Sequence, residues 1–177
     1  IRHATPRTLT TGEAALYTGL TGSRYALFSS DAFAQALGRP RAPIDPLLVF
    51  HTVFGKTVPD ISLNAVANLG YADGRFLAPV YPGDTLSAVS EVIGLKENAN
   101  GKTGVVYVRT TGLNQVGDAV LTYVRWVMVN KRDAAAPAPA AVVPALPDAV
   151  APSDLALPRG TRVLDYDFTL AGSPHAY

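Results

Sequence analysis

Apolar residues recur with helical spacing in the first part of the chain. The run at 14–17 follows Thr10 and Glu13, whose spacing is that of a capping box, so a helix is predicted there. A second, shorter helix is predicted between Ser30, a good N-cap, and Gly38, which favours a helix end.

The next segment, 45–56, predicts the central helix. Asp45 is placed to cap it, and Pro46 takes the first helical position, where the missing N–H would have had no partner in any case. The apolar residues are spread around nearly the whole circumference: Leu47, Leu48, Val49, Phe50, Val53 and Phe54. A helix that is apolar nearly all round is expected to be buried.

The pattern changes to strands after Leu63. β-branched and aromatic residues dominate four segments, at 64–80, 84–95, 103–113 and 119–129. Asn100-Gly101 predicts a tight hairpin turn, and Gly117 predicts a second turn that needs positive φ. The sequence therefore predicts an α+β fold, in which an antiparallel sheet from about Leu63 to Val129 wraps around the central buried helix.

Composition divides the chain near Asp133. Of the 26 residues at 133–158, 16 are Ala or Pro (ten and six), and no basic residue occurs. Repeated prolines block both helix and sheet hydrogen bonding, so this segment is predicted to be an extended linker. The expected organisation is a domain at 1–132, the linker at 133–158, and the start of a connection to a second domain at 159–177.

Composition also excludes several classes of protein. A net charge of +1 with 16% charged residues argues against a nucleic-acid surface. Apolar runs fall far short of the roughly 20 residues that cross a bilayer, so no membrane partner is expected. The chain has no cysteine, and none of its three histidines has a second ligand at metal spacing, so no metal site is predicted. A cytoplasmic globular domain is the expectation.

Three residues are candidates for chemistry, each with a simpler alternative. Asp45 is favoured as an N-cap over a carboxylate that activates water, although both roles are compatible. His51, between Phe50 and Phe54, is favoured as a core histidine over a general base. Arg24 is balanced between a solvated loop residue and a bidentate ligand for a carboxylate or phosphate.

Two segments resemble the signatures of a known enzyme family. Residues 75–92 read RFLAPVYPGDTLSAVSEV, and residues 15–23 read ALYTGLTGS. The first resembles the strand-turn-strand signature of MaoC-like hot-dog hydratases, and the second resembles the start of their hydratase motif. Longer blocks, at 5–27 and 41–87, resemble the first half of the mesaconyl-CoA hydratases still more closely.

The resemblance implies a hot-dog domain that forms one half of a double hot dog, in an enzyme that also forms homo-oligomers. It implies reversible addition of water to a branched, carboxylated enoyl-CoA, with an acyl-CoA thioester as substrate and coenzyme A as part of it. No metal or redox cofactor is implied. In this chemistry backbone N–H groups polarise the thioester carbonyl, while a carboxylate and an imidazole manage the water.

The motif is incomplete in this chain. Ser23 stands where the hydratase motif has Asp, Tyr25-Ala26 stand for Asn-Pro, and Phe28 falls at the His position. By this resemblance the second half carries most of the chemistry, and this half shapes the pocket. Asp45 and His51 remain the catalytic candidates, with Ser23, Arg24 and Tyr25 as substrate-binding candidates. A non-catalytic acyl-CoA-binding module and an acyl-CoA thioesterase remain alternatives.

Overall fold

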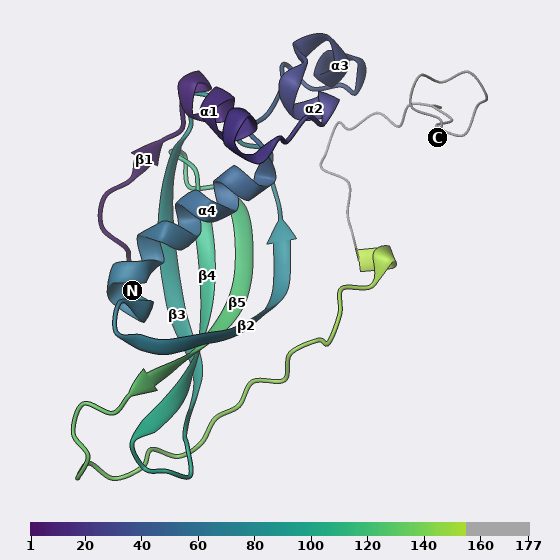
Figure 1. Cartoon of the computed structure of the whole chain (residues 1–177). Helices are drawn as coiled ribbons and strands as arrows, with labels where there is room; N and C mark the ends of the chain where they lie inside the picture. Colours follow the sequence, from purple (N-terminus) through teal and green to yellow (C-terminus); the bar gives the residue numbers. More distant parts are fainter. Residues whose placement is uncertain (155–177) are drawn as a thin grey trace.

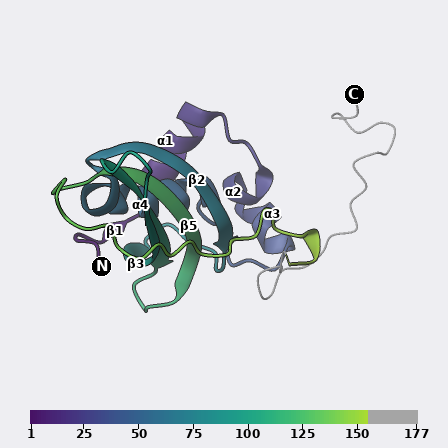
Figure 2. The ribbon, with the colours of Figure 1, turned by 90° about the horizontal axis from the view of Figure 1, so that it is seen from below.

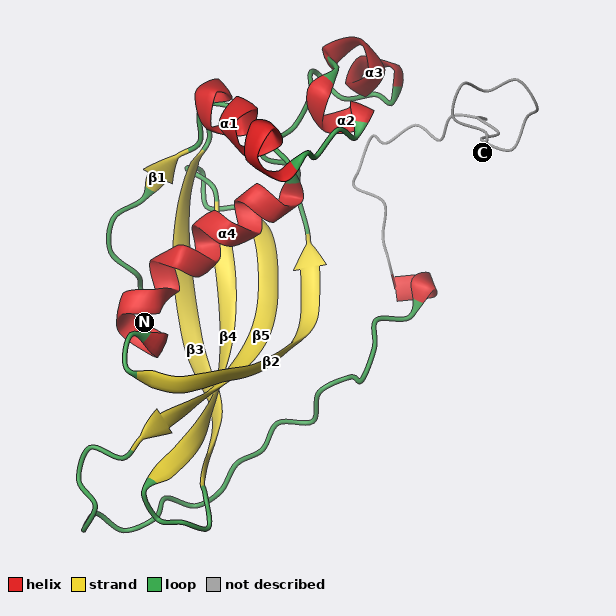
Figure 3. Ribbon diagram, in the orientation of Figure 1, coloured by secondary structure: helices red, strands yellow, loops and turns green. Residues whose placement is uncertain are grey.

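Four long antiparallel strands curl around one helix in the computed structural model, which describes residues 1–154 (Figures 1 and 3). The strands are β2 (Ala65–Phe76), β3 (Thr85–Glu97), β4 (Thr103–Leu113) and β5 (Ala119–Asn130), and a short β1 (Arg7–Thr8) pairs with β3. The sheet order is β1-β3-β4-β5-β2. Seen from below, the helix lies inside the curl of the sheet (Figure 2). The predicted α+β architecture is confirmed.

Both predicted hairpin turns are present. Gly101 has φ +64° between β3 and β4, and Gly117 has φ +91° between β4 and β5. These are left-handed backbone conformations that glycine adopts without steric cost. Short turns therefore make β3, β4 and β5 a meander, whereas β2 joins the far side of β5 and forms one edge of the sheet.

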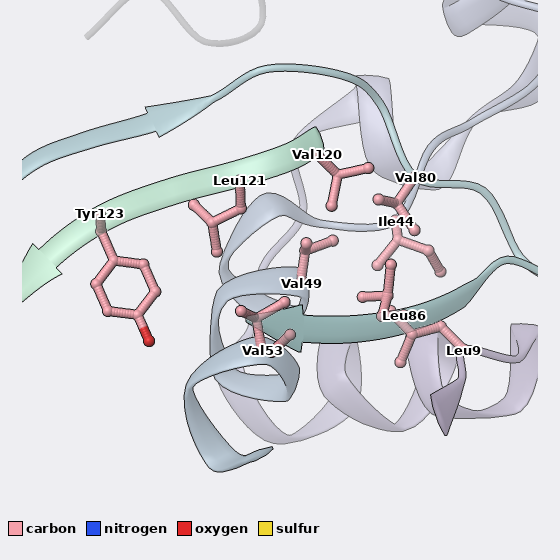
Figure 4. Close-up of a cluster of buried hydrophobic side chains, with 10 residues drawn as sticks. Leu9, Ile44, Val49, Val53, Val80, Leu86, Val120, Leu121 and Tyr123 are labelled. Carbon is pink, nitrogen blue, oxygen red and sulfur yellow. The ribbon is translucent and has the colours of Figure 1, made fainter. Parts of the chain in front are cut away.

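The central helix, α4 (Pro46–Thr57), lies on the concave face of the sheet. Val49 and Val53 pack among Leu86 of β3 and Leu121 and Tyr123 of β5 (Figure 4). A Cβ on Gly112 would lie 2.7 Å from a Val53 methyl carbon, so β4 needs glycine where the helix approaches.

The expectation that α4 is buried all round is wrong. Leu47, His51 and Gly55 are exposed and follow one another at intervals of four residues. That spacing places them on one stripe of the helix, which faces away from the sheet. Only the opposite face of α4 is covered, because the sheet curls around it from one side.

Three shorter helices sit beside the N-terminal end of α4: α1 (Thr11–Thr21), α2 (Ala26–Ser29) and α3 (Asp31–Ala36) (Figure 1). The predicted capping box is present, since the Thr10 hydroxyl accepts from Glu13 N and the Glu13 carboxylate accepts from Thr10 N. Ser30 caps α3, and Gly38, with φ +83°, follows its end, as predicted.

The chain after β5 is extended up to the short 3-10 helix at Pro152–Asp154. Lys131 pairs with Glu97 of β3 directly after β5. Further along, Val142 N donates to Leu95 O at 2.8 Å and Arg75 Nη1 donates to Asp154 O at 3.0 Å, so the segment stays attached to the sheet. The prediction that this segment is extended and lacks regular secondary structure holds from 134 to 151, apart from the single bridge of Val142 to Leu95, and the 3-10 helix at Pro152–Asp154 departs from it. The last four linker residues and the segment 159–177 lie outside the described residues, and the domain boundaries stay a prediction.

Within the described part of the chain, no helix combines the length and the apolarity that a membrane span requires. The same residues contain no cluster of three or more His, Asp or Glu side chains that could hold a metal ion.

Candidate functional site

Asp45 and Ser23 meet at the N-terminal end of α4. Asp45 Oδ1 accepts a hydrogen bond from Leu47 N at 2.8 Å, which confirms the N-cap role. Its other oxygen, Oδ2, accepts from the Ser23 hydroxyl at 2.6 Å. The carboxylate is therefore held in one orientation, with one oxygen on the helix end and the other on the loop after α1.

The end of α1 delivers Ser23 to this position. Gly22 terminates the helix with φ +71°, and its N–H donates to Thr18 O at 2.9 Å. Ser23 N then donates to the Thr21 hydroxyl at 3.3 Å. Ser23, at the position of the motif aspartate, therefore supplies a hydroxyl group at the N-terminal end of α4. Asp45 supplies the carboxylate that this hydroxyl contacts.

His51 is exposed on the outward stripe of α4. The favoured interpretation as a core histidine is therefore wrong. Its ring lies 6.1 Å from the Tyr17 ring and 5.7 Å from the Phe50 ring, measured between centroids. Asp45 and His51 are six residues apart, about 9 Å along the helix, and the described residues show no hydrogen bond between them.

Tyr17 is a neighbour of both candidates that the sequence pattern did not single out. Burial raises the pKa of the Tyr17 phenol, and the negative charge of Asp45 adds to the rise. With its ring also beside His51, Tyr17 connects the two candidates across α1 and α4. The sequence did contain one indication that Tyr17 is a functional candidate, because Tyr17 lies within the segment 15–23 that resembles the hydratase motif.

Arg24 and Tyr25 lie on the surface of the loop that carries Ser23. Both are exposed, and Tyr25 packs edge-on against Phe28 at 5.5 Å between ring centroids. Among residues 1–154, Arg24 makes no hydrogen bond or ion pair with its side chain. The structure thus brings Ser23 to the candidate carboxylate and leaves its two neighbours exposed on the same loop.

An apolar cavity lies between the start of α4, the segment that carries Phe28 and the segment after β2. Phe28, at the position of the motif histidine, forms part of its wall, and Arg39 is its charged member. The full lining is Leu27, Phe28, Arg39, Pro43, Ile44, Pro46, Val49, Phe76, Ala78, Pro79 and Val80. Ile44 and Pro46 precede and follow Asp45 in the sequence, but Asp45 itself is not among the lining residues.

A serine–histidine–aspartate arrangement also occurs, near the N-terminal segment. His3 Nδ1 lies 2.6 Å from Asp60 Oδ2, and His3 Nε2 lies 2.7 Å from Ser90 Oγ. Ser90 is buried, however, and its hydroxyl also lies 2.8 Å from that of Thr110. This group ties the N-terminal segment to β3 and does not present a serine nucleophile to a substrate.

The curled sheet, its helix and a polar group at the helix N-terminus define a MaoC-like hot-dog protein. A MaoC domain protein dehydratase from Chloroflexus aurantiacus, described as putative, superposes with a TM-score of 0.90 at 64% identity. The match covers 99% of this chain and 50% of that one. A Mycobacterium tuberculosis protein with a double hotdog fold gives a TM-score of 0.69 at 28% identity, covering 78% of this chain and 43% of that one.

The family profile of mesaconyl-CoA hydratase matches residues 1–171, and the chain belongs to that family. Mesaconyl-CoA hydratase of Cereibacter sphaeroides is 67% identical over all 177 residues, which cover 52% of that protein. Beta-methylmalyl-CoA dehydratase of Chloroflexus aurantiacus is 64% identical over the same 177 residues, which cover 50% of it. The chain spans about half the length of these curated relatives. The resemblance found in the sequence is confirmed.

Proposed function

We propose that the complete protein interconverts mesaconyl-CoA and β-methylmalyl-CoA by addition and removal of water. The observation that carries this proposal is the 64–67% identity, over the whole chain, to relatives with those two names. The proposed enzyme is a hydro-lyase of CoA thioesters that uses no metal or redox cofactor. A cytoplasmic location belongs to the proposal, because its CoA thioester substrate is a cytoplasmic type of metabolite.

The proposed role of this chain is to form the pocket together with a second hot-dog domain. The relatives are about twice as long, which leaves room for such a domain. Two surfaces of residues 1–154 support a partner: the edge of β2 that no described strand covers, with Val66 and Leu69 exposed, and the outward stripe of α4, with Leu47 exposed. Exposed apolar residues beside an unpaired strand edge are typical of a docking surface. Assembly of the complete protein into homo-oligomers is part of the same proposal.

Asp45 and Ser23 are the proposed water-binding pair of this half. The Ser23 hydroxyl orients the carboxylate, and the positive end of the α4 dipole stabilises its negative charge. Hydration adds hydroxide to one carbon of the double bond and a proton to the other, so a second group must exchange a proton. His51, exposed and beside Tyr17, is the proposed candidate on this chain for that exchange.

Arg24 is the proposed partner of the free carboxylate of mesaconyl-CoA, with Tyr25 beside it. Its position next to Ser23 puts a cation on the loop that reaches Asp45. Since the described residues leave its guanidinium unpaired, both of its donor edges are open to a ligand.

The test is an assay of the purified complete protein with mesaconyl-CoA, in which two signals are followed together. Hydration lowers the absorbance of the enoyl thioester without releasing a thiol, and the reverse reaction restores it. Release of free CoA thiol with the double bond intact would instead identify a thioesterase. If neither signal changes while the thioester still binds, the protein is a binding module and the proposed activity is wrong.

A further inference from the structure

Tyr17 is a polar residue beside the candidate site, and the chemistry proposed above gives it no task. Its ring contacts His51, and the charge of Asp45 acts on its phenol. We propose that Tyr17 is a further catalytic residue, whose phenol O–H donates a hydrogen bond to the thioester oxygen while water adds. The inference rests on the proposed function in one respect, which is that the reacting double bond lies between Asp45 and His51.

Tyr17 lies on the side of α1 that is turned to the core. Ala14 and Tyr17, three positions apart, are half-buried, whereas Leu16 and Leu20 are exposed. Residues three positions apart share one face of a helix, and Ala14 packs against the hydrophobic core that includes Val49 of α4. The side chain of Tyr17 therefore belongs to the face of α1 that meets α4, which is where its ring contacts His51.

Both ends of α1 are fixed, which holds Tyr17 in place. Thr10 and Glu13 form the capping box at the start, and Gly22 ends the helix in a left-handed conformation. In the last turn, the Thr21 hydroxyl donates to Tyr17 O at 2.7 Å. A donor that the fold holds in this way needs little reorganisation when charge develops near it, and such preorganised donors are the ones that stabilise a transition state.

The Tyr17 hydroxyl is available to a ligand. Among residues 1–154 it makes no hydrogen bond, and the two oxygens of Asp45 are already occupied by Leu47 N and by the Ser23 hydroxyl. Burial raises the pKa of the phenol, and the negative charge of Asp45 adds to the rise, so Tyr17 keeps its proton at neutral pH. A half-buried donor without a partner gains a hydrogen bond when a substrate oxygen reaches it.

The proposed reaction needs a neutral donor at this place. As hydroxide bonds to the carbon farther from the thioester, the electron pair of the double bond moves toward the thioester, and negative charge develops on its oxygen. The charge disappears when the nearer carbon takes a proton, so one water has been added and Tyr17 still has its own proton. The thioester is bonded to that nearer carbon, whose proton His51 is proposed to exchange. A donor to the thioester oxygen is therefore expected beside His51, where the Tyr17 ring lies.

The first test measures hydration by the complete protein. Tyr17→Phe keeps the ring and removes the O–H group, and it is expected to lower kcat about 100-fold with a much smaller change in KM, because the charge develops only in the transition state. The matched control is Tyr107→Phe, which removes a phenol whose ring stacks on Trp126, and it is expected to keep the kcat of the parent. A kcat of Tyr17→Phe within about twofold of the parent would overturn the inference.

The second test keeps the phenol and changes its acidity. Fluorination lowers the pKa of a phenol, and a phenolate cannot donate, so a fluorinated tyrosine at position 17 is expected to move the alkaline fall of kcat to lower pH. Tyr17→Phe is expected to lack this fall. Asp45 and His51 on α4, and Glu13 one turn earlier on α1, where it accepts from Arg7, are the same in all these proteins. A shift of the fall therefore reports on position 17, and an unmoved fall would contradict the inference.

A binding measurement separates this inference from the proposed function. Butyryl-CoA, isotopically labelled at its thioester carbonyl, has no double bond to hydrate but keeps the thioester oxygen. Its C=O stretching frequency in the infrared is expected to fall on binding to the parent and to fall less on binding to Tyr17→Phe. This result in a protein without hydratase activity would refute the proposed function alone. An active hydratase in which Tyr17→Phe keeps both kcat and the full frequency shift would refute this inference alone.

Discussion

Asp45 performs two tasks with its two carboxylate oxygens, one on the backbone of α4 and one on Ser23. Asparagine caps helices about as well as aspartate, so a substitution can separate these tasks. In Asp45→Asn the cap persists while the negative charge is lost. In Asp45→Ala both are lost.

We expect Asp45→Asn to keep the free energy of unfolding within about 0.5 kcal/mol of the parent and Asp45→Ala to lower it by about 1 kcal/mol. Both variants are expected to lose about 100-fold or more in kcat of the complete protein, since both remove the group proposed to hold the water. Urea unfolding and the hydration assay provide the two measurements. Full activity in Asp45→Asn would leave Asp45 as a helix cap only.

Arg24 gives a prediction about substrate choice. An exposed loop arginine that pairs with the substrate carboxylate matters only for substrates that have this group. Arg24→Ala is expected to lower kcat/KM for mesaconyl-CoA more than for crotonyl-CoA, by roughly 2–5 kcal/mol if the pair is buried in the complex. Arg24→Lys is expected to recover little, because lysine lacks the planar fork.

Crotonyl-CoA is the matched control for this prediction, since it lacks the second carboxylate. The same loss on both substrates would assign Arg24 to the loop or to CoA, and the selectivity argument would then be wrong.

At the scale of single residues, the roles that depend on neighbours in the sequence, such as helix capping, could be predicted. The capping roles of Thr10, Asp45 and Ser30 follow from residues two or three positions away, and all three are confirmed. The exposure of His51 was not predicted, because it depends on which face of α4 the sheet covers. Tyr17 was missed for the same reason, since its contact with His51 requires α1 to pack beside α4.

At the scale of elements, the end of α3 sets the position of Arg39. Gly38 has φ +83°, where a Cβ is strained, whereas a Cβ added at Gly19, inside α1, would meet no neighbouring side chain within 4 Å. Gly38→Ala is therefore expected to destabilise the protein by about 1 kcal/mol, and Gly19→Ala to stabilise it by about 0.5–1 kcal/mol. Denaturant unfolding of the two variants checks the opposite signs. Equal shifts would show that the turn tolerates alanine.

A carboxylate on β2 connects this strand to β4, across β5, which lies between them. Asp73 accepts from Arg109 Nη1 at 3.0 Å and from Arg75 Nε at 3.3 Å, and Arg109 lies on β4, beyond β5. Ala72 and Arg109 both pair with Val124 of β5, which is fully buried. The ion pair thus extends over Val124. The hydrogen bond from Arg109 is the largest cause that holds the pKa of Asp73 below its usual range.

Since the folded pKa of Asp73 is lowered, its contribution to stability is present above the unfolded pKa of about 3.9 and is lost as the pH falls through the folded pKa. Asp73→Asn, which also tolerates the observed φ of +50°, is expected to flatten the fall in stability below about pH 4. Urea unfolding between pH 7 and pH 2.5 measures this fall. A parallel fall in parent and variant would mean that solvent screens the pair completely.

At the scale of the whole molecule, the meander of β3, β4 and β5 was predictable because Gly101 and Gly117 join neighbouring strands by short turns. The pairing of β2 with β5 was not predictable from local pattern, since more than forty residues separate the two strands in the chain and nothing between them specifies which edge β2 takes. The two-residue β1 also exists only through its partner, β3.

The proposed division between two halves predicts a result for this chain by itself. Residues 1–177 expressed alone are expected to hydrate mesaconyl-CoA little or not at all, whereas the complete protein is active. The reason is that Ser23 and Phe28 stand at the positions of the motif Asp and His. Circular dichroism provides the control that the fragment is folded. Comparable turnover by a folded fragment would assign the chemistry to this half, with Asp45 as the first residue to test.

The hydrogen bonds of Val142 and Asp154 give the segment after β5 a defined route. The contact of Val142 with Leu95 lies against Gly94, where a Cβ would come within 2.5 Å of Val142 O. The contact of Asp154 with Arg75 lies one residue from Phe76 in the cavity wall. The segment is therefore held against the sheet, and it returns the chain to the C-terminal end of β2. For the second hot-dog domain proposed above, a connection anchored in this way raises the effective concentration of that domain beside this half and reduces the entropy lost on assembly.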